Sequence, residues 1–149
     1  MISRALKSFG HTLVGDPKPL VVHYHVTTAC NFRCIFCNIW REGTRLYPNQ
    51  VPADKIKEHL EQFAEIGTVN VDFTGGEPLL RPELGKLYAH AKDCGFLTTI
   101  NTNGWFVERR IEELHNFVDY AQVSLDSPIP EENDYIRGKR GAHKHAVQA

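Results

Sequence analysis

The sequence lacks any apolar run long enough to cross a membrane, and it carries almost no net charge. No stretch of its 149 residues approaches the roughly 20 apolar residues that a transmembrane helix needs. Its 17 Lys and Arg residues nearly balance 18 Asp and Glu residues, so the charge gives no reason to expect a nucleic-acid partner. The N-terminus also lacks the continuous apolar core of a secretory signal peptide, so we expect a cytoplasmic protein.

Internal repeats and low-complexity linkers are also absent, and the length suits one domain with its own core. We expect this domain to cover residues 20–149, behind an N-terminal extension of residues 1–19. Apolar residues in the extension recur at roughly helical spacing: Ile2, Leu6, Phe9 and Leu13. They predict a short amphipathic helix that lies on the domain or, less readily, on a membrane surface.

Hydrophobic periods of about two and about 3.6 alternate along the chain, which is typical of βα units. Strands are predicted at residues 20–27, 68–74, 96–102 and 119–126. Helices are predicted at residues 52–66, 82–94 and 107–116, with a fourth that begins near Asn133 or later. The sequence therefore predicts an α/β fold of four βα units, which do not suffice to close a barrel.

Three of the predicted strands place polar residues on one face. These are His23, His25 and Thr27 in the first strand and Asn70, Asp72 and Thr74 in the second. In the fourth strand, Gln122, Ser124 and Asp126 oppose Ala121, Val123 and Leu125. A parallel sheet buried on both faces reads instead as continuous apolar runs. We therefore expect helices on the apolar face and water, a ligand or a cofactor on the polar face.

Cysteine is scarce, but three of the four cysteines fall within eight residues, as Cys30-Asn-Phe-Arg-Cys34-Ile-Phe-Cys37. In a reducing compartment this spacing indicates metal binding before disulfides. Three thiolates can ligate three irons of a cubane cluster and leave the fourth iron open, as a catalytic metal site requires. Two alternatives remain: a zinc site that a histidine completes, or a ferredoxin-type electron-transfer cluster. Cys94 falls on the apolar stripe of a predicted helix and is expected to be a packing thiol.

A second motif, Thr74-Gly75-Gly76-Glu77-Pro78, ends the second predicted strand. Paired glycines let the backbone approach a ligand closely, and the Glu77 carboxylate suits an ammonium group. Alone, this motif could be a turn into a helix. Both motifs, however, follow the carboxyl ends of neighbouring strands, where α/β sheets place their ligands.

Together the two motifs resemble those of the radical S-adenosylmethionine superfamily. The cysteines match its CxxxCxΦC pattern, with Phe36 as the aromatic residue, and residues 75–77 match its GGE motif. Thr-Asn-Gly at residues 102–104 and Val-Ser-Leu-Asp at residues 123–126 resemble the subgroup that makes molybdenum cofactor, pyrroloquinoline quinone and peptide modifications. The resemblance covers about residues 21–138.

The resemblance implies the first four units of a partial (βα)6 TIM-like barrel, incomplete at its C-terminal end. It also implies a [4Fe–4S] enzyme that cleaves S-adenosylmethionine reductively to a 5′-deoxyadenosyl radical, which takes hydrogen from an unknown substrate. Reduced ferredoxin or flavodoxin would be the electron donor. The family's later strands and C-terminal cysteines have no counterpart here, so the resemblance implies a fragment or a second polypeptide that completes the barrel.

The site residues that the resemblance implies are of three kinds. Cluster ligands would be Cys30, Cys34 and Cys37, and contacts to the methionine amino group would come from Gly75, Gly76 and Glu77. Contacts to ribose or the methionine carboxylate would come from Thr102, Ser124 and Asp126, with Phe36 along the adenine. Arg137 would help to neutralise that carboxylate or a substrate. The rival reading is a non-catalytic zinc or iron–sulfur module for binding or electron transfer.

Overall fold

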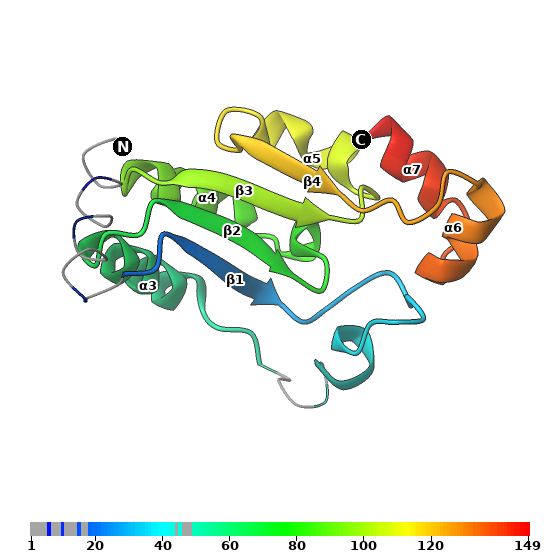
Figure 1. Ribbon diagram of the computed structural model, residues 1–149, viewed down its shortest axis with the longest axis horizontal. Coiled ribbons are helices and arrows are strands. Elements are labelled where there is room, and N and C mark those ends of the chain that lie inside the picture. The colour runs from blue at the N-terminus through cyan, green and yellow to red at the C-terminus, as the bar shows by residue number, and fades with distance from the viewer. Residues whose placement is uncertain (1–5, 7–9, 11–14, 16–17, 44, 46–48) are drawn as a thin grey trace.

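A four-stranded parallel sheet lies at the centre of the fold, in the order β1-β2-β3-β4 (Figure 1). Its strands are β1 (Val21–Thr27), β2 (Asn70–Gly75), β3 (Leu97–Thr102) and β4 (Tyr120–Val123). The computed structural model describes residues 6, 10, 15, 18–43, 45 and 49–149. The helix predicted within residues 1–14 therefore lies almost entirely outside the described residues. The predicted α/β class and the four parallel strands are confirmed.

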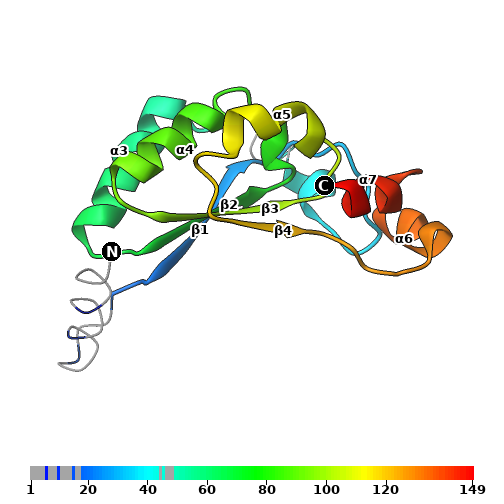
Figure 2. The same ribbon diagram turned by 90° about the horizontal axis from the view of Figure 1, so that it is seen from above.

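Three helices cover one face of the sheet, as Figure 2 shows. They are α3 (Ala53–Glu65), α4 (Leu84–Asp93) and α5 (Val107–Leu114), and each follows a strand or its loop in the chain. Pro52 precedes α3, where a proline without an N–H costs no hydrogen bond, and Gly67, at φ 97°, follows the end of that helix. No helix in the described part of the chain is long and apolar enough to cross a bilayer.

The main core lies between these helices and the sheet. Its fully buried residues are Ile56 and Leu60 of α3, Val71 and Phe73 of β2, and Leu84, Leu87, Tyr88 and Ala91 of α4. Each large apolar side chain buried in this way contributes about 1.5–3 kcal/mol. The predicted apolar faces of these three elements are thus confirmed. The opposite face of β1 carries the exposed side chains of His23 and His25.

The fourth strand is shorter than predicted, and its apolar face is not buried. β4 covers residues 120–123 instead of 119–126. Ala121 is exposed and Leu125 is 47% exposed. The prediction failed because β4 is an edge strand whose following helices continue past its end and do not turn back over the sheet (Figure 2).

The C-terminal region forms two short helices where one was expected. α6 (Pro130–Arg137) begins before Asn133, because Pro130 suits the first helical position. It ends at Gly138, whose φ of 60° stops the helix, and α7 (Ala142–Gln148) follows Gly141. The Asp134 carboxylate accepts hydrogen bonds from the N–H groups of Gly141 and His143, at 2.5 and 2.9 Å, and so joins the two helices.

Two further short helices lie beside the site described below. A π-helical turn, η1 (Ile39–Gly43), follows the cysteines, and a 3-10 turn, η2 (Pro78–Leu80), follows the glycine motif. Each connects a strand end to the helix that returns along the sheet. The two motifs singled out in the sequence therefore lie in neighbouring loops at one end of the sheet (Figure 1).

Candidate functional site

A cavity of about 160 Å³ lies at the carboxyl ends of the strands. The predicted site residues that line it are Cys30, Cys34, Phe36, Cys37, Gly75, Gly76, Thr102, Ser124 and Arg137. They come from the cysteine loop, the ends of β2 and β3, the residue after β4, and the end of α6. The tertiary structure thus gathers residues more than 100 positions apart around one space, with Glu77 and Asp126 outside its lining.

The cysteine loop is held in place by contacts of its backbone and its aromatic residues. Phe32, only 1% exposed, packs edge-on against Trp105 with ring centres 5.8 Å apart. The Trp40 indole N–H donates to the Cys34 carbonyl at 2.9 Å. The N–H groups of Arg33 and Ile35 donate to carbonyls at the end of α6, at 3.3 and 3.0 Å. The end of α6 therefore braces the loop.

Two thiols of this loop, Cys30 and Cys34, are harder to ionise than ordinary cysteines. Burial raises the pKa of Cys30, against a smaller opposing effect of the Phe32 N–H. Burial also raises the pKa of Cys34, and the Arg137 guanidinium, 4.0 Å from Sγ, offsets part of that increase. Metal binding to these side chains must therefore displace protons.

The two glycines bring the end of β2 into contact with the chain that leads to the cysteines. A Cβ on Gly75, at φ 128°, would lie 2.2 Å from the Thr27 carbonyl oxygen. One on Gly76 would lie 2.2 Å from the Ala29 carbonyl oxygen. The N–H groups of Gly76 and Glu77 donate to these same oxygens at 2.8 Å. No residue with a side chain fits this approach.

The Glu77 carboxylate is buried inside the protein and does not face the cavity. It is 0% exposed and accepts hydrogen bonds from Leu79 N at 3.0 Å, Thr102 Oγ1 at 2.8 Å and Asn103 N at 2.8 Å. Burial raises its pKa, and these three donors oppose the increase. The motif therefore offers the cavity the backbone of Gly75 and Gly76, whereas the Glu77 side chain joins β2 to β3.

Arg137 reaches the cavity from α6 and is positioned by two neighbours. Its Nε forms an ion pair with Asp126 Oδ2 at 2.5 Å. Its guanidinium lies 5.5 Å from the centre of the Phe36 ring, an attractive cation–π arrangement. Asp126, in turn, donates its backbone N–H to Asn133 Oδ1 at 2.9 Å. Asp126 thus acts on the cavity through Arg137.

Sequence reasoning gave no role in the site to several residues that belong to it. Thr74, Asn101 and Asn103 also line the cavity, and the Asn103 amide donates to Asn31 Oδ1 at 2.8 Å. Their positions at strand ends were a signal that could have found them. The fully buried Asn133 gave no signal, since only the fold places it beside Asp126. Cys94, as predicted, packs against the main core.

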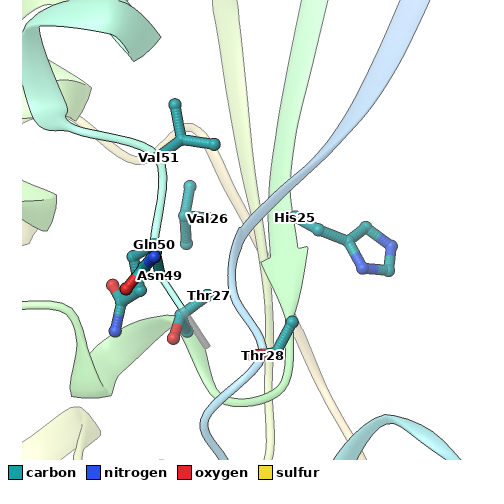
Figure 3. Close-up of a pocket in the computed structure, with 7 residues that line it drawn as sticks. All are labelled: His25, Val26, Thr27, Thr28, Asn49, Gln50 and Val51. Atoms are coloured by element: carbon teal, nitrogen blue, oxygen red, sulfur yellow. The ribbon is translucent and has the colours of Figure 1, made fainter. Parts of the chain in front are cut away.

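Two other cavities contain none of the cysteines. One, of about 320 Å³, lies between the end of β1 and residues 49–51 (Figure 3). There His25 projects to the opposite side of β1 from Asn49, Gln50 and Val51. The other, of about 300 Å³, is an apolar groove between α5 and β4, lined by Ile111, Ala121, Val123 and neighbouring residues.

The chain is similar to known proteins in sequence and in fold. The family model described as "Radical SAM superfamily" matches residues 24–149. Fe-coproporphyrin III synthase of Methanosarcina barkeri is 33% identical over 135 residues, which are 89% of this chain and 33% of that protein. PqqA peptide cyclase of Bradyrhizobium diazoefficiens is 32% identical over 132 residues, 87% of this chain and 34% of that protein. The chain thus spans about a third of the length of these relatives.

The solved structure of Streptococcus suis SuiB bound to S-adenosylmethionine has the same fold over 95% of this chain and 34% of its own, with a TM-score of 0.75 and 23% identity. This likeness confirms the prediction of the first units of a partial TIM-like barrel. The family uses a [4Fe–4S] cluster and S-adenosylmethionine, and its members among the relatives are enzymes. By its sequence and its fold, the chain belongs to the Radical SAM superfamily.

Proposed function

We propose that this chain binds a [4Fe–4S] cluster and S-adenosylmethionine and cleaves the latter reductively. The observation that carries the proposal is the single cavity that three cysteines share with Gly75 and Gly76. When bound, the reduced cluster supplies the electron that splits the sulfonium into methionine and a 5′-deoxyadenosyl radical, which takes hydrogen from a substrate.

The cysteines suit a cluster better than a single metal ion. In the described residues, no group of three or more His, Cys, Asp or Glu side chains is placed to hold a metal ion. A cubane presents its irons at separate corners, so its thiolates need not converge on one point. Cys30, Cys34 and Cys37 would each hold one iron, and the fourth would stay open because Cys94 packs against the main core instead.

The backbone of the glycine motif would receive the methionine end of S-adenosylmethionine. Gly75 and Gly76 line the cavity without side chains, so their peptide groups are accessible to an ammonium group. Glu77 would support this contact from behind, since its carboxylate joins the end of β2 to Thr102 and Asn103 at the end of β3. Thr102 and Ser124, at the ends of neighbouring strands, would contact the ribose or the carboxylate.

Two residues of the cavity would complete the binding of the cofactor. Phe36 lines it and is 61% exposed as a residue, which leaves room beside its ring for the adenine. Arg137 would neutralise the methionine carboxylate or a substrate anion, while Asp126 keeps the guanidinium in position.

Further partners would bind at two surfaces. The apolar groove between α5 and β4 leaves Ile111 45% exposed beside an unpaired strand edge. Additional strands that complete the barrel, in a second polypeptide or the same one, would cover it.

The second surface lies beside the cysteine loop, where Arg33 and Arg41, both exposed, flank the Trp40 ring. They suit an acidic electron donor such as reduced ferredoxin or flavodoxin.

We assign residues 20–149 to this cofactor-binding domain and residues 1–19 to an extension. We expect the protein to act in the cytoplasm, because free thiols and clusters of this kind need a reducing compartment. Its substrate would be bound by the polar face of the sheet together with parts that lie beyond the four strands.

Anaerobic reconstitution tests the proposal. The chain should take up about four irons, and the absorption spectrum of the cluster should change when S-adenosylmethionine is added. Preferential binding of zinc, or a cluster whose spectrum ignores S-adenosylmethionine, would favour the rival zinc or electron-transfer module.

A further inference from the structure

We propose that His23, Asp72 and Asn101 form a binding site for a hydrogen-bond donor, an N–H or O–H group of the substrate, on the polar face of the sheet. The proposal rests on the proposed function only in naming the occupant as the substrate. Its geometry stands independently of the cluster.

The three side chains meet across three adjacent strands. His23 of β1 and Asp72 of β2 are partners in the sheet register, and His23 Nδ1 lies 2.6 Å from Asp72 Oδ2. The Asn101 amide, from β3, donates a hydrogen bond to the same oxygen. The network is therefore built on rigid strands and not on loops.

The carboxylate of this network is buried and only partly satisfied. The Asp72 side chain is 4% exposed, and its Oδ1 has no hydrogen-bond partner among the described residues. The His23 side chain is 69% exposed. Burial of a carboxylate is costly, and an ion pair with such an exposed partner recovers little of that cost. Stability alone thus gives no reason for Asp72 at this position.

The arrangement determines which imidazole nitrogen faces outward as an acceptor. An ionised carboxylate can only accept hydrogen bonds, so His23 Nδ1 must carry the proton that lies between them. In the neutral ring, Nε2 then presents its lone pair to the open face. Asp72 Oδ1 is itself buried, so Nε2 is the acceptor that this network presents to the open face, and the site therefore selects a ligand that donates.

The site adjoins the cofactor cavity through Asn101. Asn101 lines that cavity, as does Thr74, two residues after Asp72 in β2 and about 7 Å along the strand. The helices α3, α4 and α5 all lie on the other face of the sheet (Figure 2). A molecule held by His23 would thus rest on the open face, beside the cavity where the radical is expected to form.

The tautomer of His23 is tested by nitrogen-15 NMR of the histidine rings. The chain is measured in its metal-free form, at a pH where imidazole is neutral. The wild-type chain should show His23 protonated at Nδ1, and Asp72→Ala should move the ring toward the Nε2-protonated form. His23→Gln assigns the signal. A wild-type His23 protonated at Nε2 would overturn the proposal, whatever the variant does.

Ligand binding is tested by titration with methylguanidinium and with glycerol, which donate hydrogen bonds, and with dimethyl sulfoxide, which only accepts them. The His23 Nε2 signal should shift saturably with at least one of the two donors and not with dimethyl sulfoxide. Asp72→Ala should weaken that binding about tenfold, equivalent to about 1.4 kcal/mol. His25→Gln, a matched change at an exposed histidine on the same face, should leave it unchanged.

The result separates this inference from the proposed function. No saturable shift with either donor, or an equal shift with dimethyl sulfoxide, would refute the site even if cluster assembly and the response to S-adenosylmethionine succeed. Donor binding without cluster assembly would retain the site and refute radical chemistry. His23→Gln should assemble the cluster as the wild type does, since His23 is not expected to ligate iron.

Discussion

The Thr102 hydroxyl donates a hydrogen bond of 2.8 Å to Glu77 Oε1, and both residues are almost fully buried. The backbone pairing of β2 with β3 ends at Phe73 and Ile100. The bond between Glu77 and Thr102 therefore connects the two strands beyond their last paired residues. Thr102 Oγ1 also accepts from Gly104 N at 3.1 Å. The carboxyl ends of the two strands are therefore locked together at the point where the cavity opens.

Replacement of Glu77 by alanine should destabilise the chain by about 2–4 kcal/mol, because it leaves buried donors on Leu79, Thr102 and Asn103 without an acceptor. Urea unfolding measures the change. An exposed carboxylate such as Glu131, replaced in the same way, should change stability by less than about 0.5 kcal/mol. Equal effects of the two substitutions would show that the Glu77 network contributes nothing.

Replacement of Cys34 by alanine should abolish cluster assembly, whereas Cys94→Ala should leave it intact. The first residue lines the cavity and the second packs against the main core. Iron content and the absorption spectrum after anaerobic reconstitution are the measurements. If both variants lose the cluster equally, Cys94 is a ligand and the open-iron arrangement is wrong.

Replacement of Gly76 by alanine should cost more than about 2 kcal/mol and impair binding of S-adenosylmethionine, because the new Cβ would lie 2.2 Å from the Ala29 carbonyl oxygen. Gly10→Ala is the matched control, since its Cβ would meet nothing within 4 Å. Thermal unfolding and the cofactor-induced spectral change should both distinguish the two. A fully stable Gly76→Ala chain would mean that the loop before Cys30 moves freely.

Asp119 should make the stability of the chain sensitive to acid. Burial pushes its pKa upward, but the Lys92 ammonium at 2.7 Å and the Thr98 donors outweigh that effect, and the pKa is lowered on balance. A lowered pKa stabilises the folded state at pH values above the pKa of the unfolded chain, which is about 3.9 for aspartate. This stabilisation is lost as the pH falls through the pKa of the folded chain. Urea unfolding from neutral pH down to about pH 2 should show a shallower acid loss in Asp119→Asn than in the wild type. An identical pH profile would contradict the role of the Lys92 contact.

The hydrophobic patterns were sufficient for the parallel sheet and for the faces of α3 and α4. Ile56, Leu60, Leu84 and Leu87 recur at helical spacing and are all fully buried. The same reasoning failed for β4, where Ala121 and Leu125 alternate with polar residues yet remain exposed. Alternation predicts two unlike faces, but whether a helix covers the apolar one depends on the path of the chain afterwards.

The sequence alone determined the two motifs, the three cysteines and the glycine pair, because local spacing fixes which thiols can share one loop. The tertiary structure decided what surrounds them. It turned Glu77 inward, since three buried donors meet its carboxylate, and it brought Arg137 to Cys34 from 103 residues away. It also placed His23 beside Asp72, a pairing set by strand register. Such contacts depend on which segments fold against one another, and no local pattern encodes that.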